Sequence, residues 1–369
     1  MRILAAFDSF KSAIDQVQVV DAVSRGLMNG YGEGVDVDRC PLADGGEGSS
    51  LLLKQQGGVE QPLRVADAYG QARQAHWVLW RNIALVESAQ GSPYLPPHQR
   101  PLADPKGTTS RGTGQLIAAA LDDSRVEEVW VGLGGTGSID GGIGLLDALG
   151  YQFFDGKERR LPATIDAWRH VRRVKAALLS KPVVGLADVL VPLLGENGAM
   201  ARFGPQKGLA SQDIKNVEDS LAAFAHVVAP GAAVIPGAGA AGGMGFALHA
   251  AGARLESGAA WWAGWSDLDK RVAKADFVVT GEGRLDEQSL LGKVVSAVLE
   301  SAQRHDKRVA VLAGQIPQDL EPFYRRGMWI ALPIGSGAAT LAEALAATEM
   351  RLEATAATLG RMLKAVSER

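Results

Sequence analysis

Arg2-Ile-Leu-Ala-Ala-Phe7 is, after its first residue, an apolar run that predicts a buried strand, and the segments after it decide the fold. Residues 15–29 carry apolar side chains at helical spacing and end at Gly30. Residues 35–40 favour a second strand, and residues 48–56 favour a short helix. This β-α-β-α order is typical of a parallel sheet covered by helices.

The pattern changes at residue 59. Residues 59–65, 75–80 and 83–87 alternate apolar and polar side chains, which predicts antiparallel strands. Alternating strands and helices return at about residue 244 and continue to a C-terminal helix over roughly 340–366. The second half of the chain therefore ends with the same alternation of strands and helices with which the first half begins.

These two changes indicate an α/β protein with two domains. We expect a Rossmann/flavodoxin-like parallel-sheet domain formed by both termini, residues 1–58 and 246–369, and an inserted mixed α/β domain at residues 59–245. Termini that share one domain are common, and 369 residues suffice for two domains.

The composition excludes several classes of protein. Hydrophobic residues make up 47% of the chain, which excludes intrinsic disorder, and a net charge of −3 argues against a nucleic-acid partner. Cys40 is the only cysteine, so no disulfide forms within the chain. No run of 18 apolar residues and no signal peptide is present, so we expect a cytoplasmic protein without a membrane partner.

The 45 glycines gather in clusters that also contain acids and lysines. The first cluster of charged residues, Asp8-Ser9-Phe-Lys11, has no glycine itself and follows the first expected strand. In a doubly wound sheet, ligands bind beyond the carboxyl ends of the strands. Asp8 and Lys11 are therefore candidates for a ligand site, and a helix N-cap by Asp8 or Ser9 is the structural alternative.

The second cluster is Ala43-Asp44-Gly-Gly-Glu47-Gly48, just before an expected helix. A turn and an N-cap explain the aspartate and one glycine. They do not explain Glu47 or the other glycines. Two acids at this point suit a metal ion or a substrate hydroxyl.

The third cluster, Gly132–Gly142, has six glycines in eleven positions between an apolar strand and a helix. The backbone amides of such a loop can hold an anion, helped by the helix N-terminus. Thr136 and Ser138 add hydroxyl donors, and Asp140 is a candidate metal ligand. A structural turn rarely needs so many glycines.

Two charged residues stand apart from these loops. Lys207 lies in Phe203-Gly-Pro-Gln-Lys-Gly208, where a lysine that neutralises phosphates and a solvated loop lysine are equal alternatives. Asp188 directly follows the apolar run Val183–Ala187, so it is another acid at a strand end.

Gly237, Gly239 and Gly242 form a G-x-G-x-x-G pattern, and Glu256 follows at about the spacing of the dinucleotide fingerprint. This leaves a nicotinamide dehydrogenase as an alternative. The fingerprint requires a full strand before the first glycine, whereas Pro236 stands there after only a short apolar stretch. The pattern is therefore weak evidence.

The last cluster, Thr280-Gly-Glu282-Gly-Arg284-Leu-Asp286 with Lys293, again follows an apolar strand. A helix cap accounts for Asp286 only. Together, these loops supply what phosphoryl transfer needs: anion donors, carboxylates for a metal, and a base for a hydroxyl. The P-loop motif and the protein-kinase motifs are both missing from the sequence.

In this order the six clusters resemble the bacterial glycerate kinase family, the type that lacks a P-loop, over almost the whole chain. The resemblance implies phosphorylation of D-glycerate with ATP and Mg²⁺, mostly at the 2-hydroxyl. It also implies two α/β domains with the site in the cleft between them. Three positions depart from the family pattern: Ile139 and Val191 replace asparagines, and Ala187 replaces a cysteine.

From these motifs we formulate one hypothesis for the roles of the site residues. Asp44 or Asp188 accepts the hydroxyl proton, with Lys11 and Lys207 neutralising charge. The hydroxy acid binds at Asp8, Ser9, Arg284, Asp286 and Lys293. Nucleotide phosphates bind at Gly134, Gly135, Thr136, Gly237, Gly239 and Gly242. Mg²⁺ binds at Asp140, Glu47 or Glu282.

Several alternatives stay open. A related small hydroxy acid, or 3-phosphoglycerate as the product, would fit the same motifs. A nicotinamide-dependent dehydrogenase and a non-catalytic sensor of sugar acids are more distant. A homodimer is an alternative to a monomer.

Overall fold

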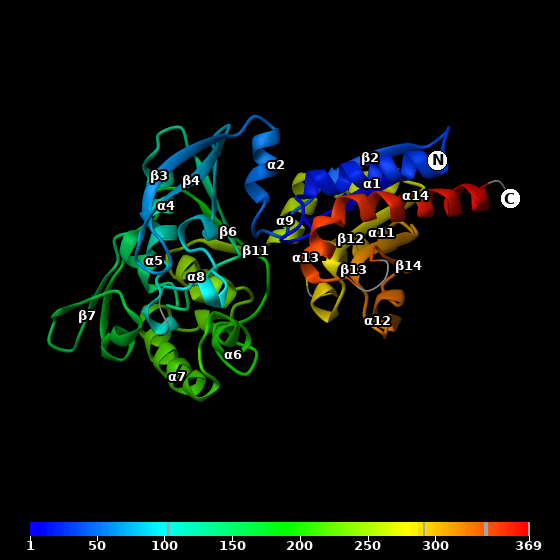
Figure 1. Ribbon diagram of the computed structural model, residues 1–369. Coiled ribbons are helices and arrows are strands. Elements are labelled where there is room, and N and C mark those ends of the chain that lie inside the picture. The colour runs from blue at the N-terminus through cyan, green and yellow to red at the C-terminus, as the bar shows by residue number, and fades with distance from the viewer. Residues whose placement is uncertain (102–103, 291, 336–338, 368–369) are drawn as a thin grey trace. The chain divides into compact units, whose positions relative to one another are not determined.

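The computed structural model describes residues 1–101, 104–290, 292–335 and 339–367. The chain divides into two compact units. The first combines Met1–Asp44 with Ala259–Arg369, and the second is Gly45–Gly258. The predicted α/β class, with a first domain from both termini and a second domain inserted, is confirmed. Figure 1 shows the two units in the colours of the chain.

The sheet of the first unit has five strands, all parallel, in the order β14-β13-β12-β1-β2. Its strands are β1 (Arg2–Phe7), β2 (Asp36–Pro41), β12 (Phe277–Arg284), β13 (Val309–Gln315) and β14 (Met328–Pro333). Counted along this unit, the order is 2-1-3-4-5, which is the flavodoxin-like arrangement. The strand order therefore reverses between β1 and β12, and ligands of such sheets bind at that point.

Helices cover both faces of this sheet, so β1 is buried on both sides. Ile3, Ala5 and Phe7 pack in one cluster with α1 and α14, whereas Leu4 and Ala6 pack in another with α10 and α11. The helices are α1 (Gln16–Tyr31), α9 (Gly258–Trp265), α10 (Leu268–Lys274), α11 (Val294–Arg304), α12 (Glu321–Tyr324), α13 (Leu341–Ala346) and α14 (Thr348–Ser367).

Helices α1 and α14 lie side by side although they come from opposite ends of the chain (Figure 1). Their backbones touch, since a Cβ at Gly30 would lie 2.0 Å from the carbonyl oxygen of Ala357. The C-terminal segment, expected as one helix, forms two. Thr340 and Glu343 start α13 with a capping box, and the helix ends at Ala346, followed by Ala347, without a glycine or proline to mark the break.

The main sheet of the second unit has six strands in the order β11-β10-β6-β5-β4-β3. The pairs β3–β4 and β4–β5 are antiparallel, as the alternation predicted, and the other pairs are parallel. Its strands are β3 (Val59–Ala66), β4 (Ala72–Trp80), β5 (Ile83–Glu87), β6 (Glu128–Leu133), β10 (Val183–Ala187) and β11 (Arg254–Ser257). A small antiparallel sheet, β8-β7-β9, consists of β7 (Gln152–Phe154), β8 (Arg160–Leu161) and β9 (Arg173–Lys175), and the sequence patterns did not predict it.

The helices of the second unit share one large core with the six-stranded sheet. Leu116 of α4, Leu146 of α5, Phe224 of α7 and Phe246 of α8 are all fully buried there. The helices are α2 (Ser49–Gln55), α3 (Ser88–Gly91), α4 (Arg111–Asp122), α5 (Ile143–Ala148), α6 (Ala199–Phe203), α7 (Ser211–Val228) and α8 (Ala240–Ala250).

The boundaries of the units differ from the expected ones. Residues 45–58 and 246–258 were expected in the first unit but belong to the second. Helix α2 contacts β4 and β5, and β11 extends the six-stranded sheet by pairing with β10. These short segments belong to the second unit because of their contacts with its sheet. Their own periodicity does not show such contacts, so the sequence placed both domain boundaries wrongly.

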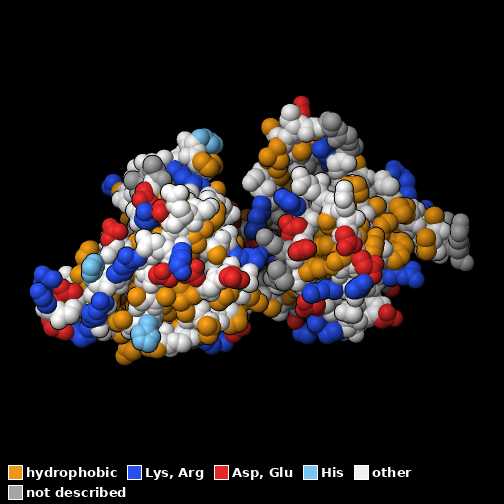
Figure 2. Space-filling model, turned by 90° about the horizontal axis from the view of Figure 1, so that it is seen from below, with side chains coloured by type: hydrophobic (Ala, Val, Ile, Leu, Met, Phe, Trp, Pro, Cys, Tyr) orange, Lys and Arg blue, Asp and Glu red, His pale blue; other side chains and the backbone are white. Residues whose placement is uncertain are grey.

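On the face drawn in Figure 2, acidic and basic side chains lie close together over much of the surface. Such a mixture agrees with the net charge of −3. Among the helices of the described ranges, none combines the length and the apolar character needed to cross a membrane.

Candidate functional site

A cavity of about 570 Å³ opens in the first unit at the carboxyl ends of its strands. Asp8 follows β1, Glu282 belongs to the end of β12, and Gln315 ends β13. The cavity therefore lies where the strand order reverses. Of the residues predicted to form the site, it brings together Asp8, Ser9, Lys11, Asp44, Glu282, Arg284, Asp286 and Lys293.

Asp8 is a buried carboxyl group in this cavity. Its Oδ1 accepts a hydrogen bond of 2.6 Å from the amide of Ser9. Burial, and then the neighbouring Asp44 carboxylate, raise the pKa of Asp8 to about 8, although Lys11 opposes the shift. The N-cap alternative for Asp8 and Ser9 is wrong, because α1 begins later and Asp15 caps it.

Asp8 is expected to make the stability of the first unit depend on pH. Its raised pKa means that the folded chain holds a proton that the unfolded chain releases above about pH 4, so folding loses stability as pH rises from about 4 to 8. Asp8→Asn is expected to flatten this slope and to exceed the wild type in stability by a few kcal/mol at pH 9. Urea unfolding at pH 5, 7 and 9 measures it. Parallel curves for the two proteins would show that Asp8 is ionised throughout.

Lys11 and Asp44 form an ion pair in the same cavity, with 2.9 Å between Nζ and Oδ2. The Asp44 side chain is only 3% exposed, whereas that of Lys11 is 56% exposed. Lys11 can therefore reach toward a bound anion, while Asp44 stays fixed at the wall.

Glu282 is the third carboxyl group of the cavity. Burial raises its pKa to about 7, although Ser289 and Lys293 oppose the shift. Its Oε1 is buried and, within the described part of the chain, has no hydrogen-bond partner. Arg284 and Asp286 lie beside it as a mostly exposed ion pair with 3.6 Å between Nε and Oδ2. An oxygen left unpaired in a buried place suits a cation or a proton.

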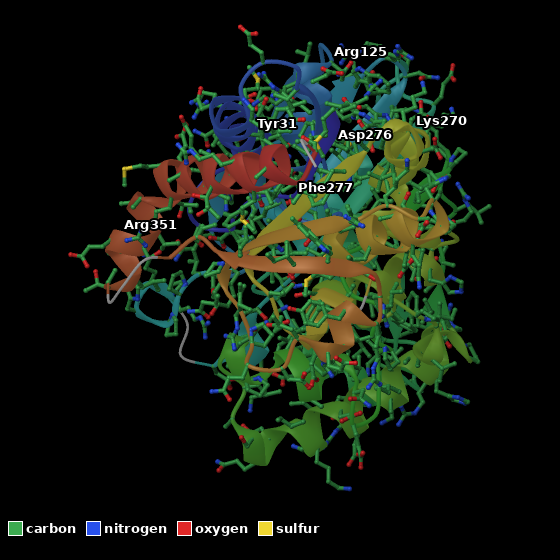
Figure 3. All side chains as sticks on the ribbon, turned by 90° about the vertical axis from the view of Figure 1, so that its right-hand side faces the viewer. Tyr31, Arg125, Lys270, Asp276, Phe277 and Arg351 are labelled. Atoms are coloured by element: carbon green, nitrogen blue, oxygen red, sulfur yellow. The ribbon has the colours of Figure 1, made fainter. Side chains whose placement is uncertain are left out.

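The sequence did not single out Arg351, which lines the cavity from α14. In Figure 3 it lies on the red helix, on the opposite side of the view from Lys270. Its position within a long helix gave no signal of a role. It adds a fourth cation to the wall, beside Lys11, Arg284 and Lys293.

The second unit holds a separate charged group around Lys207. Its ammonium group is buried and donates to the Ser138 carbonyl at 2.9 Å and to Thr136 Oγ1 at 3.3 Å. Burial lowers the pKa of Lys207 to about 8, although Asp188 and Asp140 oppose the shift. The solvated-lysine alternative is therefore wrong.

The loop that carries Lys207 is held by a residue that the sequence did not indicate. Arg100 donates to the carbonyl of Gln206 at 2.7 Å and to that of Leu95 at 2.8 Å. The hydroxyl of Tyr94 donates to the same Gln206 carbonyl at 3.2 Å. These bonds fix the backbone next to Lys207.

The glycine loops at residues 132–142 and 237–243 pack directly on each other. The amide of Gly141 donates to the carbonyl of Gly242 at 3.1 Å. Gly242 has φ = +69°, and a Cβ there would lie 2.1 Å from the Ser138 carbonyl oxygen. The segment before Gly237 is a 3₁₀ turn, Ala232–Val234, rather than a strand. The G-x-G-x-x-G pattern thus serves close packing and lacks the strand of a dinucleotide site.

Some amides of the first loop remain available to a ligand. Ser88, another residue missed at a strand end, accepts from the Gly134 amide, and the amides of Gly137 and Ile139 have partners too. In the described residues, the amides of Gly135 and Thr136 have none. The Ser138 hydroxyl is buried and also unpartnered there. Together with the Lys207 ammonium, these groups suit an anion.

Asp140 has a structural role, because backbone amides and a hydroxyl group donate hydrogen bonds to both of its carboxylate oxygens. The amide and hydroxyl of Ser110 donate to its Oδ2, both at 2.8 Å, and the amides of Gly144 and Gly142 donate at 3.1 and 3.2 Å. Burial raises its pKa. Asp140 thus joins the starts of α4 and α5, and its surroundings do not suit a metal ligand.

Asp188 and Glu47 lie against the loop instead. A Cβ at Gly134 would be 3.1 Å from Asp188 Oδ2, and one at Gly135 would be 2.7 Å from Glu47 Oε1. Ile139, by contrast, is buried in the core of the unit. The family's asparagine is replaced by Ile139 at a core position, so this replacement removes no side-chain amide from the group around Lys207.

The glycerate kinase family model matches residues 3–364 of the chain. The chain belongs to the glycerate kinase family. Membership covers both units, and it makes the protein a kinase. The predicted resemblance is confirmed.

Individual members of the family agree over nearly the full length. A glycerate kinase of Neisseria meningitidis serogroup B is 34% identical over 98% of this chain and 99% of its own. The glycerate 2-kinase of Escherichia coli K12 is 33% identical over 93% of both chains. A crystal structure described as glycerate kinase 2 from Salmonella typhimurium LT2 matches with a TM-score of 0.81, 32% identity and complete coverage of both chains.

Within this kinase the predicted site residues fall into two groups. The cavity group of the first unit contains Lys11, Asp44 and Glu282, and the loop group of the second contains Lys207 and Asp188. Gly237 and Gly239 pack against protein atoms rather than lining either group.

Proposed function

We propose that the chain transfers the γ-phosphoryl group of ATP to the 2-hydroxyl of D-glycerate. One observation carries this proposal: each unit has its own group of cations and polar donors suited to an anion. A glycerate kinase needs two such groups, because both the triphosphate and the hydroxy acid are anions. The regiochemistry is supported by the relative in Escherichia coli, which is named a glycerate 2-kinase.

Phosphoryl transfer needs a base near the acceptor hydroxyl and positive charge near the phosphates. Asp44 and Asp188 are the candidate bases, one in each unit. Lys11 and Lys207 are the matching cations: Lys11 pairs with Asp44, and Asp188 favours the charged form of Lys207. Each candidate base thus has a lysine near it, and that lysine can balance negative charge when the acceptor hydroxyl gives up its proton.

Mg²⁺ would be held in the first unit by Glu282. Kinases commonly hold this ion with one or two carboxylates and the phosphates of the nucleotide. In the described ranges, no three acidic, histidine or cysteine side chains are placed so that together they could hold a metal ion, so the protein alone does not form a full metal site there. The unpartnered Glu282 Oε1 fits a single carboxylate ligand. When bound, the ion would neutralise charge on the phosphates.

A coupled assay of ADP release over a panel of hydroxy acids tests this function. D-Glycerate is expected to give the highest kcat/KM, above L-glycerate, glycolate and D-lactate. A higher value for another acid would move the specificity away from glycerate and would point to Val191 as a cause. Binding of NADH without binding of ATP, in fluorescence titrations, would contradict the kinase itself.

The remaining expectations stay predictions. They are the expected cytoplasmic location, and a homodimer as the alternative to a monomer. Gel filtration with light scattering measures the second.

A further inference from the structure

We infer that the cavity of the first unit binds the nucleotide, with its base against the apolar side chains of α13. This inference rests on the proposed function and reverses the expected roles of the two groups. Arg284, Asp286 and Lys293 then face phosphates rather than the hydroxy acid. The loop group around Lys207 would then bind the hydroxy acid.

The apolar wall is the first argument. Helix α13 contributes only apolar side chains to the cavity: Leu341, Ala344 and Leu345. None of its residues is buried, and Leu341 is 72% exposed. A leucine that lines a cavity yet stays exposed is apolar surface that a ligand can cover. A purine base has such a face, whereas a hydroxy acid is polar or charged at nearly every atom.

The size of the cavity is the second argument. A volume of about 570 Å³ lies within the range that holds a drug-sized ligand. A molecule as small as glycerate would leave most of it empty. A nucleoside triphosphate would fill it, with the base against α13 and the phosphates toward the strand ends.

The charged groups and the topology agree with this orientation. Lys11, Arg284 and Lys293 come from the strand ends and the start of α11, and Arg351 comes from α14. Four cations suit a triphosphate better than a single carboxylate. In flavodoxin-like sheets, the crevice where the strand order reverses is the place where a nucleotide cofactor binds.

Ala344→Trp tests the inference by filling the apolar side of the cavity. The dissociation constant for ADP, followed with N-methylanthraniloyl-ADP and competition by ADP, is expected to rise about tenfold or more. The KM for ATP is expected to rise with it, and the KM for D-glycerate to change less than about twofold. Ala342→Trp is the matched control, because Ala342 is exposed on the same helix and does not line the cavity.

Leu341→Ser provides a second variant that cannot unfold the chain through core loss, since Leu341 is exposed. It is expected to weaken ADP binding severalfold. If Ala344→Trp raised the KM for D-glycerate and left ADP binding unchanged, the cavity would hold the acid and the inference would be overturned. If ADP binding fell as expected but no hydroxy acid were phosphorylated, the inference would stand and the proposed function would fail.

Discussion

Lys207→Met is expected to lower kcat for ATP-dependent phosphorylation about a hundredfold or more. The variant keeps the length of the side chain and removes a buried ammonium group that donates to Thr136 and to the Ser138 carbonyl. Removing one preorganised donor to a developing negative charge typically costs a factor of about 10² to 10³ in kcat. Steady-state kinetics with saturating ATP and D-glycerate measure the loss.

The pH dependence of the wild type gives a second view of the same residue. Because the pKa of Lys207 is lowered to about 8, its ammonium group loses its proton as pH rises through that value. Activity is therefore expected to fall above pH 8, and Lys207→Met is expected to lack this decline.

Two further variants separate catalysis from folding. Lys215→Met removes an exposed lysine of α7 in the same unit and is expected to keep wild-type kinetics. Thr136→Val removes only one hydrogen-bond partner of Lys207 and is expected to lower kcat by a smaller factor, about tenfold. Wild-type kcat in a correctly folded Lys207→Met variant would show that this lysine is structural.

Asp44→Asn is expected to lower kcat by a factor of about 10² to 10⁴, the usual contribution of a general base. Asparagine keeps the shape of the side chain at a position that is only 3% exposed, and it cannot take the hydroxyl proton. Lys11 loses its ion pair with Asp44 in this variant but is largely exposed, so the fold is expected to survive. The measurement is kcat over pH 5 to 9.

A base and a positioning residue differ in that pH profile. If Asp44 is the base, the acidic limb of the wild-type profile disappears in Asp44→Asn and remains in Asp188→Asn. The reverse result would assign the base to Asp188. Asp36→Asn, at an exposed acid of the same unit, is the control and is expected to behave as the wild type. Wild-type kcat in both Asp44→Asn and Asp188→Asn would refute the assignment of the base to either acid.

The sequence predicted the fold well where periodicity is strong. The apolar run of β1 and the apolar spacing in α1 are long enough to show their period, and the structure has this strand at Arg2–Phe7 and this helix at Gln16–Tyr31. The strands β7, β8 and β9 are only two or three residues long, and pairing alone defines them. The break between α13 and α14 has no glycine or proline, so composition could not place it.

The sequence predicted which types of residue form the candidate site, but it did not predict how they are arranged in space. Acids and lysines after strands indicated Asp8, Lys11 and Glu282, which one cavity brings together. Nothing in the sequence distinguished Asp140, whose oxygens bind backbone amides, from Glu282, whose Oε1 is unpartnered within the described residues. Arg100, Ser110 and Arg351 act through contacts far along the chain, and sequence spacing does not show such contacts.

Phosphorus NMR of the chain with ATP, Mg²⁺ and D-glycerate follows the proposed phosphoryl transfer itself. The γ-phosphorus signal of ATP is expected to disappear while ADP and 2-phosphoglycerate appear in equal amounts. The phosphorus of 2-phosphoglycerate couples to a single proton, and that of 3-phosphoglycerate would couple to two. Unchanged ATP in the presence of D-glycerate and a correctly folded chain would show that the protein does not phosphorylate D-glycerate.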